Sequence, residues 1–239
     1  MVVSAMRRVR PCSYYRYAAN AATLAALALV GCRGGPAGSP PHPAEPMGEA
    51  AAVARASADS VRYPYTEADI RFMSGMIHHH AQAIKMARWA PTHGASAAVI
   101  RLTERIINAQ TDEIVLMSNW LSARRQPVPE PNAEGMKMTM GGAEHVMLMP
   151  GMLTEAQMKE LDAARGEDFD RLFLTFMIQH HKGAVSMVKD LFAARGAGQD
   201  ETVFKFASDV EVDQTTEINR MLEMLFALGS TSQPAPRRP

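Results

Sequence analysis

Residues 69–87 read DIRFMSGMIHHHAQAIKMA, and residues 170–188 repeat the pattern as DRLFLTFMIQHHKGAVSMV. A shift from 69 to 170 superposes an acid, a phenylalanine, two methionines and two adjacent histidines of the two stretches. A second pattern, Q-x-x-E-I-x-x-M, starts at Gln110 and again at Gln214. The chain is therefore predicted to contain two copies of one unit.

The apolar residues of each copy recur at helical rather than alternating spacing. Thr66 and Thr154 begin capping-box patterns, and Ser96 is a suitable helix N-cap. Because short connections join the helices of each copy, each unit is expected to be an antiparallel hairpin. No alternating segment is found, so the predicted fold is all-α without a sheet. Long helices are expected over 67–89, 97–123, 168–194 and 200–228, with shorter ones over 49–62 and from Thr154 to near Gly166.

The first residues have the features of an export signal. A basic start precedes the apolar residues 18–30, which are too few to span a bilayer comfortably. Leu29-Val30-Gly31-Cys32 resembles a bacterial lipobox, in which Cys32 would carry the lipid; an uncleaved anchor or a plain signal peptide is the alternative. The expected organisation is a signal peptide (1–31), a flexible tether (32–62), the first hairpin (63–125), a Met-rich loop (126–152), the second hairpin (153–229) and a tail (230–239), with 63–229 as one domain.

The composition excludes some classes of partner. Lys plus Arg and Asp plus Glu both number 25, so net charge gives no reason to expect nucleic acid. Methionine, with 18 residues, is unusually frequent. Methionine fills irregular gaps in helical cores, and this accounts for part of the excess. Its soft sulfur is also a metal ligand.

The repeated residues share one side of their helices. Around Met76, a helical projection places His79 and His80 on the inward face, whereas His78 points away and is matched by polar Gln179 in the second copy. We therefore expect His78 at the surface. The candidate metal ligands are the inward residues Met76, His79, His80, Met86, Glu113, Met117, Met177, His180, His181, Met187, Glu217 and Met221.

Burial of these groups needs compensation. Polar and charged side chains removed from water cost several kcal/mol unless they are paired. In one interpretation Glu113 and Glu217 simply accept hydrogen bonds from the histidines. Paired histidines flanked by methionine, present twice in one chain, favour a metal site instead. Asp69 and Asp170 are expected to be helix-start residues without a metal role.

The pattern D-x-x-F-x-x-x-M-I-x-H-H-x-x-A-x-x-M resembles the signature of the bacterial CopM-like family, also called domain of unknown function 305. The Q-x-x-E-I-x-x-M stretches and the segment from Gly151 to Phe173 strengthen the resemblance, which covers about residues 63–228. It implies a ferritin-like four-helix bundle, usually exported, with some members binding copper and contributing to copper resistance.

The segment between the copies has methionines without helical spacing. Thioethers suit Cu(I) better than Mg, Ca or Mn, and they do not form disulfides in an oxidising compartment. An amphipathic flap that buries its methionines on the bundle is the alternative. The candidate auxiliary ligands are Met136, Met138, Met140, His145, Met147 and Met149, followed by Met152.

The leading functional hypothesis is an exported, lipid-anchored protein that sequesters Cu(I) or Cu(II) or passes it to a copper-handling partner in the cell envelope. No catalytic residues are assigned. A di-metal redox enzyme is an alternative, but such sites use Glu-x-x-His on one helix, and here methionine takes the glutamate's place. A structural or interaction bundle without metal is a third hypothesis.

Overall fold

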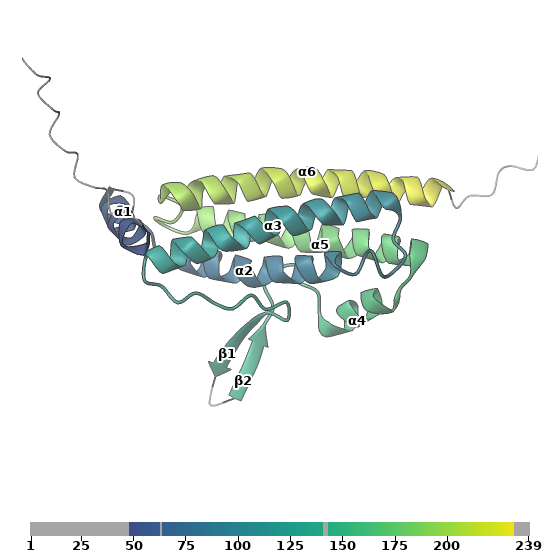
Figure 1. Cartoon of the computed structure of the whole chain (residues 1–239), viewed down its shortest axis with the longest axis horizontal. Helices are drawn as coiled ribbons and strands as arrows, with labels where there is room; N and C mark the ends of the chain where they lie inside the picture. The colour runs from purple at the N-terminus through teal and green to yellow at the C-terminus, as the bar shows by residue number, and fades with distance from the viewer. Residues whose placement is uncertain (1–47, 63, 141–142, 232–239) are drawn as a thin grey trace, which may run out of the picture. The chain divides into compact units, whose positions relative to one another are not determined.

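The two repeats form four long helices in the computed structural model, which describes residues 48–62, 64–140 and 143–231. These helices are α2 (Glu67–Ala87), α3 (Ala97–Ala123), α5 (Gly166–Ala193) and α6 (Glu201–Thr231). α2 pairs with α3 and α5 pairs with α6 as hairpins, and α2 packs on α5 (Figure 1). The predicted four-helix bundle of two duplicated hairpins is therefore confirmed.

The helix starts follow the predicted caps. The Thr66 side chain accepts hydrogen bonds from backbone amides of α2, and the Asp69 side chain accepts one from the Thr66 amide. This reciprocal pair forms a capping box. Ser96 caps α3 through the Val99 amide. Thr154 and Gln157 form a second capping box at α4 (Glu155–Ala163). The end of α6 differs, because the helix continues through Gly229; one glycine weakens a helix by about 1 kcal/mol without ending it.

The predicted N-terminal segments are only partly described. The Ala-rich stretch Glu49–Arg62 forms the expected short helix, α1, which packs on α3. The last part of the expected flexible tether is therefore helical. The signal peptide, Cys32 and the rest of the tether lie outside the described residues, as does most of the tail. Among the helices that the structure describes, none is both long enough and apolar enough to cross a membrane.

The prediction that no sheet exists is wrong. β1 (Met136–Met140) pairs antiparallel with β2 (Ala143–Met147), with Met136 opposite Met147 and Met138 opposite His145. Methionine recurs at every second residue of β1, which is strand periodicity, and the sequence that follows contains a Gly-Gly dipeptide of the kind that favours hairpin turns. Because methionine is not a typical strand former, this alternation is a weak strand signal in the sequence.

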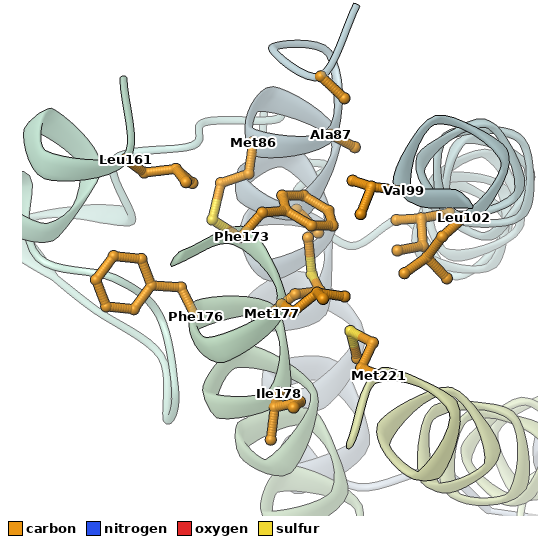
Figure 2. Packing of buried hydrophobic residues seen from close by; sticks show 14 of the residues in the cluster. Met86, Ala87, Val99, Leu102, Leu161, Phe173, Phe176, Met177, Ile178 and Met221 are labelled. Carbon is orange, nitrogen blue, oxygen red and sulfur yellow. The ribbon is translucent and has the colours of Figure 1, made fainter. Parts of the chain in front are cut away.

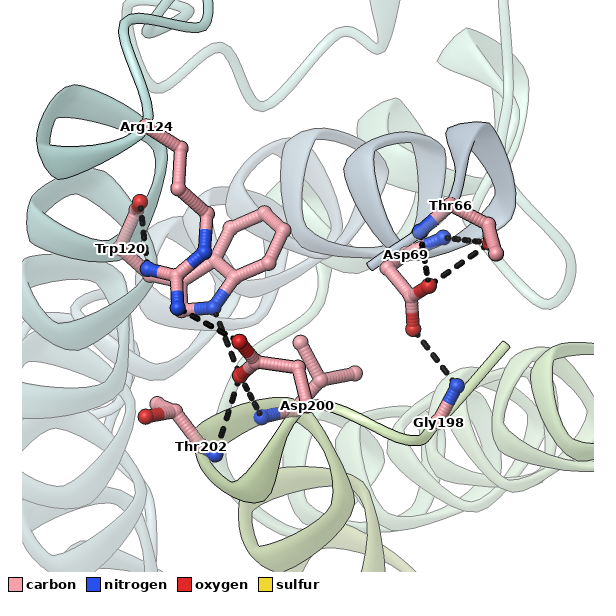
Figure 3. A network of polar contacts seen from close by, with 8 residues as sticks. Thr66, Asp69, Trp120, Arg124, Gly198, Asp200 and Thr202 are labelled. Atoms are coloured by element: carbon pink, nitrogen blue, oxygen red, sulfur yellow. Dashed lines mark hydrogen bonds and ion pairs between the residues drawn. The ribbon is translucent and has the colours of Figure 1, made fainter. Parts of the chain in front are cut away.

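Two aspartates connect the hairpins to each other. Asp69 of α2 accepts a hydrogen bond from the Gly198 amide before α6, at 2.7 Å (Figure 3). Its repeat partner Asp170 of α5 accepts from the Ser96 amide before α3, at 3.1 and 3.2 Å. Both carboxylates are buried. Each copy therefore fixes the helix–helix turn of the other copy, a structural role consistent with the expectation that neither aspartate is a ligand.

A buried ion pair closes the same end of the bundle as Asp69. Arg124 at the end of α3 lies 2.5 Å from Asp200, which also accepts from the Trp120 indole at 3.0 Å (Figure 3). Asp200 further accepts from the Thr202 and Val203 amides and so caps α6. The network positions the start of α6 against the end of α3.

The core consists of two apolar clusters separated along the helices. We call them the Phe173 cluster and the Phe72 cluster. Figure 2 shows Met86, Met177 and Met221 converging from three helices in the Phe173 cluster. The Phe72 cluster contains Met76, Met117 and Met187. Each cluster thus holds one methionine of every repeated pair, and the histidines lie between the clusters in the order of residues along α2 and α5.

Candidate metal centre

The four repeated histidines meet at the middle of the bundle. His79 and His80 come from α2, His180 and His181 come from α5, and all four are fully buried. The rings of His79 and His180 lie 3.7 Å apart between centroids, inclined by 38°. Contact between α2 and α5 therefore joins the two copies of the motif through their imidazoles.

The second helices contribute one carboxylate to each copy. His181 Nε2 donates to Glu217 Oε2 at 2.7 Å, and His80 Nε2 lies 2.7 Å from Glu113 Oε2. The His80 contact is close but poorly aligned, so its Nε2 has no hydrogen bond of good geometry. The carboxylates are about a quarter exposed, at 23% and 24%. The histidine–glutamate pairing that the metal-free interpretation predicts thus exists, but it uses only Nε2 of His80 and of His181.

His79 is tied to a segment that crosses the bundle, residues 149–153, which we call the strap. His79 Nε2 donates to the Pro150 carbonyl at 3.0 Å. Gln82, one turn further along α2, donates to the Leu153 carbonyl at 3.1 Å and accepts from the Leu153 amide at 2.6 Å. The strap covers α2 directly over the histidines.

The strap also requires a glycine on α5. A Cβ on Gly183 would overlap the Pro150 carbonyl, and Gly151 has a left-handed backbone with φ of 78°. Gly183 is the repeat counterpart of Gln82. One copy thus holds the strap through an amide side chain, and the other makes room for it by having no side chain.

The hydrogen bonds define which ring nitrogens are free. A backbone carbonyl only accepts, so neutral His79 must carry its proton on Nε2, and the same holds for His181 facing a carboxylate. In the neutral form of each ring, Nδ1 therefore carries a lone pair, and both Nδ1 atoms are buried without a hydrogen-bond partner. His80 Nδ1 and both nitrogens of His180 are also buried without a partner. The centre therefore contains buried imidazole nitrogens without hydrogen-bond partners, and it lies between the two apolar clusters.

Burial keeps the rings of His79 and His180 neutral. It lowers the pKa of His79 to about 3, with the neighbouring His80 as the next cause. Burial likewise lowers the pKa of His180 well below its usual value, assisted by His79 and His181. Neutral imidazoles are the form that binds metals. These two rings are thus available as ligands near neutral pH.

The repeated methionines reach the centre only as parts of the two core clusters. Met76, Met86, Met117, Met177 and Met221 have no exposed surface, and Met187 is 8% exposed. They pack against phenylalanine and aliphatic side chains, as core methionines do. Their position beside the histidines is established, and their role as ligands stays a prediction.

His78 is not at the surface, contrary to the prediction. It is 5% exposed, and it forms a hydrogen bond with the backbone of Asn132, in the segment that follows α3. Burial lowers the pKa of His78. The helical projection places His78 nearly opposite Met76, and the Pro-rich segment 127–132 covers that face. A projection of one helix cannot include a segment that returns from elsewhere in the chain.

The auxiliary candidates are separate from the histidines except at one end. Met138, His145 and Met147 are exposed on the β-hairpin, and Met136 is partly exposed. The Met140 side chain lies outside the described part. Met149 and Met152 instead belong to the strap, where Met149 is partly buried and Met152 is buried. The flap interpretation therefore holds for the strap, whereas the hairpin exposes its methionines.

A surface pocket of about 290 Å³ lies between α3 and α6 and is lined by both carboxylates, Glu113 and Glu217. Gln110 and Gln214 line it too, each with a buried side-chain oxygen that has no partner. Asp213 also lines the pocket, and burial followed by the charge of Glu113 raises its pKa. Asp213 was not predicted, because its repeat counterpart Ala109 carries no charge.

The described residues contain no group of three or more His, Cys, Asp or Glu side chains already arranged to hold a metal ion. Among the described residues, the centre therefore contains buried imidazoles with methionines nearby, and it contains no cage of carboxylates.

The profile of the family described as "Domain of unknown function (DUF305)" matches residues 69–225. The chain belongs to the DUF305 family. The matched region contains both histidine pairs, both glutamates, the hairpin and the strap. No curated protein matches the chain significantly.

Solved DUF305 structures have the same fold. A DUF305 protein from Streptomyces coelicolor, described as secreted, is 29% identical with a TM-score of 0.57, over 68% of this chain and 94% of that one. A DUF305 fragment from Deinococcus radiodurans is 28% identical with a TM-score of 0.56, over 68% and 98%. CopM in its Cu(II)-bound form is 27% identical with a TM-score of 0.52, over 66% and 96%. The resemblance to the CopM-like family is confirmed.

Proposed function

We propose that this DUF305 protein binds copper at the four buried histidines and sequesters it or passes it on in the cell envelope. The observation that carries the proposal is the orientation of the imidazoles. Metal-bound histidines usually donate their second ring N–H to a carboxylate or a backbone carbonyl. His181 donates to Glu217 and His79 donates to Pro150, while their Nδ1 atoms stay buried and unpaired.

The donor types favour a soft metal. Neutral imidazole suits copper and zinc, and thioether sulfur favours Cu(I) in particular. The centre has no carboxylate cage of the kind that Mg, Ca or Mn requires among the described residues. The Cu(II)-bound form of CopM, a structural relative, adds support for copper. Glu113 and Glu217 would then orient the imidazoles from outside the metal's ligand shell.

We propose binding rather than turnover. Di-metal oxidation centres in helical bundles are assembled from several carboxylates and Glu-x-x-His pairs. Each half of this centre has one glutamate, already engaged with a histidine and partly exposed. The copper is accordingly cargo, and the chain's residues hold and release it.

We further propose that the chain is exported and anchored through a lipid on Cys32. The support comes from the sequence of residues 1–32, and one structural relative is described as secreted. In an oxidising envelope, cysteine thiols would be lost to disulfide formation, whereas the thioethers of methionine would remain available as ligands. A metal-accepting envelope protein is the expected partner, and copper resistance is the expected physiological role.

An anaerobic Cu(I) titration tests the proposal. The full chain is compared with a variant in which His79, His80, His180 and His181 are all changed to Ala. The parent is expected to bind Cu(I) tightly and the variant to lose that binding, with circular dichroism showing that the variant is folded.

A second variant serves as the matched control. It changes the hairpin residues Met136, Met138 and Met147 to Leu and is expected to keep the tight site. Equal binding by the parent and the four-histidine variant would place the metal elsewhere. A parent that binds no copper would refute the proposed function.

A further inference from the structure

One face of the β-hairpin carries soft ligands in the open. Side chains alternate across a strand, so Met136 and Met138 share a face, and the register places Met147 and His145 opposite them on that same face. Met138 is 36% exposed and Met147 is 44% exposed. Solvent-exposed thioethers in such a row are costly as apolar surface, yet they are accessible to a soft cation.

The chain leads from this face directly to the strap. Met149 follows β2 by two residues, is partly buried and packs against the Phe72 cluster. Its Sδ lies 3.0 Å from the point where a Cβ on Gly75 would stand, and the Met187 methyl lies 3.5 Å from that point. Gly75 therefore provides the space in which Met149 reaches the bundle interior beside Met187.

The strap also joins Met149 to the histidines. Pro150, the next residue, accepts the hydrogen bond from His79. The Met149 amide contacts the buried Met152 sulfur at 3.3 Å. Thioethers thus occur at every depth from exposed Met147, through half-buried Met149, to buried Met152 and Met187.

We propose that Met149 is a transfer residue, through which a soft monovalent cation captured on the hairpin reaches the buried histidines. This inference rests on the proposed copper site and adds a route to it. In each step a bond from the metal to one sulfur breaks as a bond to the next donor forms. The metal keeps its charge and oxidation state, and no proton moves because a thioether carries none.

The geometry explains why a route is needed. The four histidines are fully buried, so an ion in water has no direct contact with their Nδ1 atoms. The strap lies over them and is bonded to His79 itself. A metal arriving on Met149 is therefore held in a segment that continues directly from β2 and contacts the histidine centre through Pro150.

The test follows Cu(I) loading of the full chain by rapid mixing and freeze-quenching, with X-ray absorption to distinguish sulfur from nitrogen ligands. In the parent, a sulfur-rich spectrum is expected first and a nitrogen-containing one later. Met149→Leu preserves volume and apolarity. It is expected to slow the conversion roughly tenfold, which corresponds to about 1.4 kcal/mol of barrier, while the final spectrum is unchanged.

Two further variants sharpen the test. Met224→Leu, at a partly buried methionine packed on the Phe173 cluster, is the matched control and should convert at the parent rate. Gly75→Ala keeps every sulfur but crowds Met149, so it should also slow conversion.

The outcomes separate the two proposals. Conversion by Met149→Leu at the parent rate, or nitrogen ligands appearing with no sulfur-rich precursor, would overturn the transfer role alone. If nitrogen ligands never appear in the parent, the proposed histidine site fails and the transfer role fails with it.

Discussion

At the scale of single residues, the unusual feature is a group of buried imidazoles with incomplete hydrogen bonding. A buried polar atom without a partner costs about 1–3 kcal/mol. His180 has this cost at both nitrogens, and His79 and His181 have it at Nδ1. A protein selected only for stability would not keep four such rings buried in its core. The cost is understandable if a metal ion supplies the missing partner.

Replacing His180 by Leu should therefore stabilise the metal-free protein. The change removes two unpaired nitrogens from an apolar site and is expected to raise the free energy of unfolding by about 1–2 kcal/mol. Chemical denaturation measures it. His181→Leu is the matched control and should lower stability, because His181 donates a hydrogen bond to Glu217. Destabilisation by His180→Leu as large as that of the control would show that His180 has a structural partner.

The metal-free protein should lose stability as the pH falls below about 6.5. The folded-state pKa of His79 is about 3, below its unfolded value of 6.5, so the unfolded state binds more protons between these limits. Stability is thus retained above pH 6.5 and lost as the pH falls toward 3, by up to about 1.4 kcal/mol per pH unit for this residue.

Denaturation at several pH values compares the parent with His79→Leu. The free energy of unfolding of the variant should change less steeply with pH, because the contribution of His79 is absent. An unchanged slope would mean that His79 titrates normally in the folded state.

At the scale of elements, the strap accounts for two places where the repeats differ. Gln82 binds the strap, and its counterpart Gly183 leaves space for it. Gly75 accommodates Met149, whereas its counterpart is Phe176. The duplication builds the symmetric centre, and these two departures from symmetry fit one asymmetric segment across it.

Gly183→Ala should displace the strap. Its Cβ would overlap the Pro150 carbonyl, and a backbone obstacle cannot move aside as a side-chain end can. We expect a loss of about 2–4 kcal/mol in the free energy of unfolding. Gly229→Ala is the control: it lies in α6 with nothing near its Cβ position, and should stabilise by about 0.5–1 kcal/mol. Equal stability of the two variants would contradict the packing of the strap on α5.

At the scale of the whole molecule, the halves are joined by reciprocal contacts. Asp69 and Asp170 each bind the turn of the opposite hairpin. Changing Asp170 to Ala leaves the Ser96 amide without its acceptor and should cost about 1–3 kcal/mol, measured by thermal unfolding. Asp168→Ala, at an exposed acid two residues earlier, is the control and should have a small effect. A negligible effect of Asp170→Ala would contradict the reciprocal arrangement.

Much of this arrangement was accessible from the sequence, because helices and caps depend on local patterns. The boundaries of α3, the caps at Thr66 and Thr154, and the shared face of His79 and His80 follow from periodicity and hydrogen-bonding chemistry. The burial of His78 and the strap contact with His79 do not, since both depend on segments that return from far along the chain. The alternation of Met136 and Met138 fits a β-strand, but methionine is not a typical strand former, so the spacing favours metal ligands or a flap as readily as a hairpin.

Side-chain ¹⁵N NMR of the full chain, labelled at histidine, tests the central claim most directly. Before metal is added, His79 and His181 should carry their protons on Nε2. Anaerobic addition of Cu(I), which is diamagnetic, should then shift Nδ1 resonances of the buried histidines while the Nε2 protons remain in place. Copper that binds in the same sample and leaves every buried Nδ1 unchanged would contradict a metal site at the four histidines.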